Sequence, residues 1–225
     1  MEELYAAGEA LRFGGAMVYP LLLLGLIAAV IIVDRGAAYV RSARLPEDLR
    51  RIAETYGFSW SELEEKIRVL GQRNAYARVF GVIVNNRSHP AWWVESRAAD
   101  EASCVEAKLG RGLWVLETIV TAAPLMGLLG TITGMMQSFR VIGGSGLVAP
   151  TQVTAGVAQA LIATALGLLI ALVSLFAFNW FSRVRSGLLD ELERLSSRLV
   201  DRIRLGGESD MLPAREVRTR ATAGP

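Results

Sequence analysis

Residues 118–139 read TIVTAAPLMGLLGTITGMMQSF and contain no Asp, Glu, Lys, Arg or His. Residues 13–33 and residues 141–182 share this property. A helix needs about 20 apolar residues to cross the ~30 Å hydrocarbon core of a membrane, and each of the three windows is long enough. Soluble domains do not segregate their charges in this way. The sequence of 225 residues therefore predicts an all-α, multi-pass membrane protein.

The windows predict three transmembrane helices. The first is expected at residues 16–33 and the second at residues 118–139. The third window holds 42 residues, which is too long for one crossing. Its beginning also contains residues that disfavour a helix, namely Gly143, Gly144, Ser145, Gly146 and Pro150. We therefore expect a loop at residues 140–156 and the third helix at residues 157–181.

The Lys and Arg residues predict the orientation of these helices. Residues 34–117 hold 13 of them and the chain after residue 182 holds 9. Residues 1–15 hold only Arg12, and residues 140–156 hold only Arg140. Cytoplasmic loops carry the excess of basic residues. The N-terminal segment and the 140–156 loop are therefore expected in the periplasm, and both polar regions in the cytoplasm.

The 34–117 region reads as a series of helices. Pro46 opens a short helix that ends near Gly57, and Ser59 begins a capping-box pattern whose helix stops at Gly71. After Pro90, apolar residues recur at helical spacing as far as Leu116 without a strong breaker. This pattern predicts one uninterrupted helix from the cytoplasm into the second span.

The third span is expected to continue past the membrane as a cytoplasmic helix at residues 182–207. Its apolar positions recur at spacings of 4, 4, 3, 4 and 4, namely Val184, Leu188, Leu192, Leu195, Leu199 and Ile203. This seam requires a neighbouring helix, from the same chain or from another copy. Gly206 and Gly207 are expected to end the helix, and residues 208–225 to form a disordered tail.

Small residues predict close packing of the second and third spans. Gly130 and Gly134 form a GxxxG motif, and a proline in the second span is expected to kink it. The expected packing positions are Pro124, Gly127, Gly130, Gly134, Ala160, Ala163, Gly167 and Ala171. The bulkier first span, with Leu21–Leu24 and Ile27, is expected to face lipid. The small-residue faces and the cytoplasmic seam together predict that isolated chains form a ring.

Two hydroxyl groups lie among these small residues. Thr131 is surrounded in sequence by glycines, and Thr164 by alanines and Gly167. One interpretation is that each hydroxyl bonds a carbonyl of its own helix, as is common in membrane helices. The other is that each points at a neighbouring helix or a cavity and lines a polar path. The third span also carries the amide side chain of Gln159.

Several classes of function are excluded by what the chain lacks. One cysteine, Cys104, cannot form an intrachain disulfide, and one histidine, His89, cannot form a histidine cluster. The sequence contains no phosphate-binding glycine loop, and a net charge of +2 does not favour nucleic-acid binding. We expect no enzyme activity, metal or cofactor. Because the three windows hold no Asp, Glu, Lys, Arg or His, any conducted proton is expected to be carried by a group on another protein.

Three stretches, in order, resemble the MotA/TolQ/ExbB proton-channel family, most closely its three-span ExbB and TolQ branch. They are residues 14–24 with Asp34-Arg35, residues 123–131 and residues 159–168. The resemblance implies a homopentamer in the bacterial inner membrane around two copies of a single-span ExbD- or TolR-like partner, whose membrane Asp carries the proton. It implies a TonB- or TolA-like envelope-spanning protein as a further partner.

The resemblance also implies site residues. The family's threonines in spans two and three fall on Thr131 and Thr164, and both would belong to the proton path. Some members carry a Glu five residues before the second threonine, where this chain has Gln159. That difference speaks against a proton-carrying role at this position and leaves a hydrogen-bonding role.

Three functions are weighed. The first is an energy transducer that couples the proton gradient to work in the envelope, with import across the outer membrane favoured. The alternative is a non-conducting membrane scaffold that anchors and assembles a partner. A self-sufficient transporter is disfavoured, because the sequence lacks intramembrane charges and inverted repeats.

Overall fold

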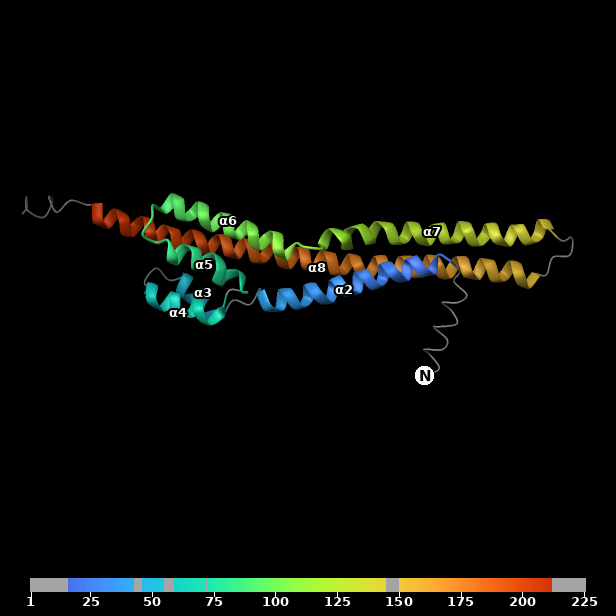
Figure 1. Ribbon diagram of the computed structural model, residues 1–225, viewed down its shortest axis with the longest axis horizontal. Helices are drawn as coiled ribbons and strands as arrows, with labels where there is room; N and C mark the ends of the chain where they lie inside the picture. Colours follow the sequence, from blue (N-terminus) through green and yellow to red (C-terminus); the bar gives the residue numbers. More distant parts are fainter. Residues whose placement is uncertain (1–15, 43–45, 55–58, 72, 145–149, 212–225) are drawn as a thin grey trace, which may run out of the picture. The chain divides into compact units, whose positions relative to one another are not determined.

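The computed structural model describes residues 16–42, 46–54, 59–71, 73–144 and 150–211, and every regular element in these ranges is an α-helix. Their order is shown in Figure 1. They are α2 (Val18–Ser42), α3 (Glu47–Glu54), α4 (Trp60–Leu70), α5 (Ala75–Asn85), α6 (Ala91–Leu109), α7 (Leu113–Gly144) and α8 (Pro150–Met211). Three helical stretches are long and apolar enough to cross a membrane. The predicted all-α fold with three such helices is confirmed.

The described chain divides into two compact units. The apolar unit contains the residues up to Ala37 and those from Gly110 to Val184, and the polar unit contains the remainder. In the apolar unit, α7 runs beside the first part of α8 (Figure 1), and Gly25 of α2 approaches Ile170 of α8. The two units are described separately below.

One face of α2 packs inside the apolar unit and the rest is exposed. Leu23, Leu26 and Val30 have exposed fractions of 58–62%. This agrees with the lipid-facing surface that we expected for the first span. Leu21 is fully buried, so its assignment to the lipid-facing surface is wrong. A single helix lying on others always buries one stripe, even when it is apolar all round.

The connection between the second and third spans is shorter than expected. Helix α7 continues to Gly144 and α8 begins at Pro150, so the predicted loop at residues 140–156 is largely helical. Pro150 occupies the first position of α8, where its missing N–H group would have no partner in the helix anyway. Residues 145–149 lie outside the described part of the chain.

The expected end of the helix that extends beyond the third span is also wrong. Helix α8 passes through Gly206 and ends at Met211, so the first residues of the predicted tail are helical. Gly206 does not adopt the positive φ that Gly71 adopts at the end of α4. Glycine inside a helix costs only about 1 kcal/mol relative to alanine, which the rest of a long helix can offset. Residues 212–225 of the predicted tail lie outside the described residues.

The predicted uninterrupted helix into the second span is broken. Helix α6 ends at Leu109, residues 110–112 form a turn, and α7 begins at Leu113. Gly112 has φ +82°, a left-handed conformation that favours glycine. Gly110 and Gly112 therefore end the helix, although the apolar residues on either side of them continue at helical spacing.

Helix α5 forms the centre of the polar unit. The apolar residues that α5 buries include Tyr76, Phe80, Ile83 and Val84, and it packs against α4 and α6. We did not predict this helix. Asn74 caps its start by accepting hydrogen bonds from the backbone N–H groups of Tyr76 and Ala77. An Asn directly before an apolar run is the signal that would have revealed it.

Helix α4 begins and ends where expected, but not by the expected bond. Ser59 is its N-cap residue, yet the hydroxyl of Ser59 contacts that of Ser61 at 2.6 Å and caps no backbone N–H. Gly71, with φ +72°, ends the helix. The capping-box pattern therefore predicted the position of the helix correctly, although the Ser59 hydroxyl does not make the hydrogen bond that defines a capping box.

The apolar seam of α8 is covered by the same chain. Leu188, Leu192, Leu195 and Leu199 are at most 5% exposed. Polar contacts flank the seam: Arg194 lies 3.1 Å from the carboxylate of Glu54, and this hydrogen bond lowers the pKa of Glu54. Of the two origins left open for the neighbouring helix, the structure shows the same chain. The seam is therefore no evidence for a ring.

A partly buried hydrogen bond joins α5 to α8. The hydroxyl of Tyr76 donates to the carboxylate of Glu191 at 2.7 Å. Burial, together with this carboxylate, raises the pKa of Tyr76 above its ordinary value. A raised pKa means that folding favours the neutral phenol. The stabilisation is therefore complete below about pH 10, where the unfolded tyrosine titrates, and is lost as the pH rises further.

Tyr76→Phe is expected to lower the free energy of unfolding by about 1.5–3 kcal/mol at pH 7, because a hydrogen bond to a charged group is lost. The difference from the unmodified protein should shrink above about pH 10. Denaturation of the detergent-solubilised protein, followed by circular dichroism, measures both. As a control, Tyr76→Phe is repeated in a Glu191→Gln background. An equal loss there would show that the two side chains are not coupled.

Candidate functional site

Glycines on α7 let α8 approach closely. A Cβ atom built on Gly130 would lie 2.6 Å from the Cβ of Ala163, and one on Gly134 would lie 3.0 Å from the Cβ of Ala160. On α8, a Cβ atom on Gly167 would lie 2.5 Å from the backbone oxygen of Ala123. Ordinary contacts between non-bonded carbon atoms lie near 3.5–4.0 Å. Side chains at these glycines would therefore push the helices apart.

The expected packing positions thus face one another within one chain. Ala160, Ala163 and Ala171 are buried, and Pro124 is half-buried inside an uninterrupted α7. This corrects the argument that small-residue faces require another copy, because α7 and α8 satisfy each other. Sequence reasoning missed Gly156, where a Cβ atom would lie 2.1 Å from the hydroxyl of Ser138. Its spacing of four from Ala160 was the available signal.

The two threonines of interest make different hydrogen bonds. The hydroxyl of Thr164 on α8 donates to the backbone oxygen of Gly127 on α7 at 3.0 Å. The hydroxyl of Thr131 donates to the backbone oxygen of Leu128, within its own helix, at 2.6 Å. The interpretation that the hydroxyl bonds its own helix therefore holds for Thr131, and the interpretation that it points at a neighbouring helix holds for Thr164. Thr164 reaches across the helix pair, whereas Thr131 bonds the preceding turn.

The other hydroxyls of α7 also bond their own helix. Thr118, Thr121, Thr133 and Ser138 each donate to a carbonyl three or four residues earlier. This is the usual arrangement for Ser and Thr in membrane helices. Thr164 differs from all of them, because its acceptor lies 37 residues away in sequence.

Gly127 places the two threonines within about one helical turn of each other along the helix pair. A Cβ atom on Gly127 would lie 3.1 Å from the Cα of Thr164. Thr131 follows Gly127 by four residues, about 6 Å along the axis on nearly the same face. Gln159 precedes Thr164 by five residues, which is about 140° around α8. The structure therefore groups Thr131 with Thr164 and places the partly exposed Gln159 on another face.

The chemistry at this level is polar but not ionisable. The charge-free windows of α7 and α8 offer hydroxyls, backbone carbonyls and one or two amides in each span. Pro124 lies less than one turn before Gly127 and has no N–H group to give to the carbonyl four residues before it. Such groups can orient water or hydrogen-bond a carboxyl group, but they cannot themselves carry a charge.

Comparison with known proteins shows the family. The profile of the MotA/TolQ/ExbB proton channel family matches residues 59–194. A putative biopolymer transport protein ExbB-like 1 of Synechocystis is 31% identical over 192 residues, covering 83% of this chain and 74% of that protein. The biopolymer transport protein ExbB of Aquifex aeolicus is 41% identical over 87 residues, which are 38% of this chain and 59% of that protein.

A TolQ protein is similar as well. The Tol-Pal system protein TolQ of Pseudomonas aeruginosa is 42% identical over 77 residues, which are 34% of this chain and 33% of that protein. The chain therefore aligns with only part of the ExbB of Aquifex and of this TolQ. The family match spans more than half of the chain, and the resemblance read from the three sequence stretches is confirmed. The chain belongs to the MotA/TolQ/ExbB proton channel family, in its ExbB and TolQ branch.

Proposed function

We propose that this protein is the channel-forming subunit of an energy-transducing complex in the bacterial inner membrane. Its membership of a transport family, rather than an enzyme family, and its similarity to ExbB and TolQ support this class of function. One observation carries the mechanism. The charge-free windows of α2, α7 and α8 hold no Asp, Glu, Lys, Arg or His, so in this proposal the proton needs a carrier on another protein.

The carrier in this proposal is the membrane Asp of a single-span ExbD- or TolR-like partner, with two partner copies inside a homopentamer of this chain. The oligomer rests on family membership alone, since the small-residue faces and the seam are filled within one chain. The work is import across the outer membrane, through a TonB-like protein that spans the envelope. Similarity to several biopolymer transport proteins supports import over outer-membrane maintenance.

The hydroxyls of Thr131 and Thr164 line the proton path in this proposal, and Gln159, which lies on another face of α8, is left out of it. Each hydroxyl donates its one hydrogen to a backbone oxygen, so its lone pairs remain available as acceptors. In this arrangement both hydroxyls accept a hydrogen bond from a protonated carboxyl group. Rotation of either hydroxyl turns it into a donor to the ionised carboxylate. The path therefore solvates both protonation states of the partner's Asp.

Proton flux into liposomes tests the proposal. The protein reconstituted alone is expected to give no flux above empty liposomes under an imposed membrane potential. Addition of the single-span partner should open a flux, and replacement of the partner's membrane Asp by Asn should abolish it. The scaffold alternative predicts a stable complex with the partner and no flux in any combination. Flux through the protein alone would contradict the need for an external carrier.

A further inference from the structure

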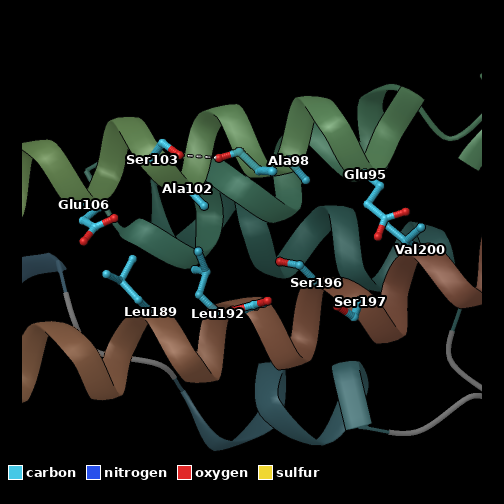
Figure 2. Close-up of a pocket in the computed structure, with 12 residues that line it drawn as sticks. Glu95, Ala98, Ala102, Ser103, Glu106, Leu189, Leu192, Ser196, Ser197 and Val200 are labelled. Atoms are coloured by element: carbon cyan, nitrogen blue, oxygen red, sulfur yellow. Dashed lines mark hydrogen bonds between the residues drawn. The ribbon is translucent and has the colours of Figure 1, made fainter. Parts of the chain in front are cut away.

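A groove of about 290 Å³ lies in the polar unit between α6 and α8 (Figure 2). Small side chains, Ala98 and Ala102, line it on α6, and Leu192 and Ser196 line it on α8. Its volume is at the lower limit of pockets that bind small molecules. Small side chains on one wall leave room for an extended peptide to lie along the helices.

The groove is acidic. Glu106 of α6 and Glu193 of α8 line it, both are exposed, and within the described residues neither forms an ion pair. Glu95, also a lining residue, pairs with Arg204. No Lys or Arg is among the residues that line the groove. An occupant with positive charges is therefore favoured over an apolar or acidic one.

A buried hydroxyl inside the groove finds no hydrogen-bond partner among the residues that the structure describes. Ser196 is 9% exposed, and its oxygen bonds nothing within the described part of the chain. Figure 2 shows its side chain projecting from α8 into the space between the two helices. Buried polar groups in native proteins are rarely left unpaired, because they lose their bonds to water without replacement. This hydroxyl indicates an occupant that brings polar backbone or side-chain groups.

We propose that the groove binds the chain's own residues 212–220, which read LPAREVRTR. This segment carries Arg215, Arg218 and Arg220 against the single Glu216. Its guanidinium groups complement the carboxylates of Glu106 and Glu193, and guanidinium pairs with carboxylate through well-matched hydrogen bonds. Val217 supplies an apolar side chain for the wall formed by the alanines. Backbone groups of the segment satisfy the hydroxyl of Ser196.

The segment is long enough to reach. Glu193 precedes Met211 by 18 residues of helix, about 27 Å along the axis of α8. The nine residues 212–220, when extended, span about 30 Å. The segment can therefore turn back at the end of α8 and place Arg220 beside Glu193.

Disulfide trapping in the full-length, detergent-solubilised protein tests this proposal. In a Cys104→Ser background, Ala99→Cys in the groove, at the level that Val217 reaches, is paired with Val217→Cys in the segment. The matched control pairs Val217→Cys with Asp100→Cys, an exposed position of α6 at the same level but outside the groove. Under mild oxidation, the groove pair is expected to form an intrachain disulfide about tenfold faster than the control, because docking raises the local thiol concentration. Intact mass and thiol counting measure it.

A second set of variants tests the charges. Glu106→Lys with Glu193→Lys in the groove-pair background should slow trapping about tenfold, and 0.5 M salt should act in the same direction. Adding Arg218→Glu and Arg220→Glu to the reversed groove should restore it. Size-exclusion profiles verify that each variant is folded. Equal rates in the two cysteine pairs, trapping in neither, or insensitivity to charge reversal would each overturn the proposal. A disulfide-linked dimer would overturn it too, because the occupant would then be another copy's segment.

Discussion

Thr164→Val is expected to lose most of the proton-driven activity while the complex still assembles. Valine keeps the shape of threonine, so the contact with Gly127 remains, but the hydrogen bond to the backbone oxygen of Gly127 is lost. A buried carboxyl group that loses one hydrogen-bonding partner is destabilised by about 1–3 kcal/mol, which corresponds to about 5–150-fold in rate. Thr131→Val is expected to act in the same direction, and the double variant to be inactive.

The assay is energy-dependent function in cells, with assembly verified by co-purification of the single-span partner. Thr121→Val is the matched control, because it removes the same hydroxyl, also bonded within α7, from a position more than two turns from Gly130 and away from the face of Gly130 and Gly134. It should be much milder. Wild-type activity in assembled Thr131→Val and Thr164→Val variants would show that both hydroxyls are structural. Loss of assembly in Thr164→Val alone would assign its bond to helix packing.

Gly130→Leu is expected to disrupt the α7–α8 pair and with it the assembly. Its first side-chain carbon would lie 2.6 Å from the Cβ of Ala163, so the helices must separate along their closest contact. Overpacking of a tight core costs about 1–3 kcal/mol, and more when the backbone must move. Leu22→Ala, at a position that is 41% exposed on α2, should be nearly neutral. Oligomer content in detergent, measured by native mass spectrometry, compares the two variants; equal losses would contradict this assignment.

Two Gly→Ala substitutions in α8 distinguish a steric clash from the general effect of replacing glycine in a helix. Gly167→Ala places a methyl group 2.5 Å from the backbone oxygen of Ala123, whereas Gly187→Ala meets nothing within 4 Å. Both replace glycine by alanine within α8. Gly187→Ala is expected to raise stability by up to about 1 kcal/mol, since alanine favours helix. Gly167→Ala is expected to lower it. Thermal unfolding of the two proteins in the same detergent checks the opposite signs.

The sequence alone was sufficient for the class of fold. The three apolar helices follow from charge-free windows, because burial in lipid requires an apolar side chain at nearly every position of a span. The breaks between helices were harder to place. The turn at residues 110–112 and the passage of α8 through Gly206 both depend on glycine, which is compatible with helix, turn and left-handed backbone alike.

The sequence alone could not predict which helix packs against each apolar face. The spacing of Leu188, Leu192, Leu195 and Leu199 predicts a neighbouring helix but does not name it. The structure supplies the neighbours from the same chain. Periodicity reports which side of a helix is apolar, whereas the identity of the neighbour depends on loop paths and competing contacts that no local pattern contains. For this reason, the apolar seam and the small-residue faces do not support the prediction of a ring.

Sequence determined which residues could form the site, and tertiary structure decided what each of them does. Thr131 and Thr164 both stand among small residues, and nothing local distinguishes them. The register of α7 against α8 does: Gly127 lies against Thr164, so that hydroxyl reaches a carbonyl of the other helix, while Thr131 bonds Leu128 of its own. A hydroxyl donates to the nearest well-placed acceptor, and across helices that acceptor exists only once the backbones have packed.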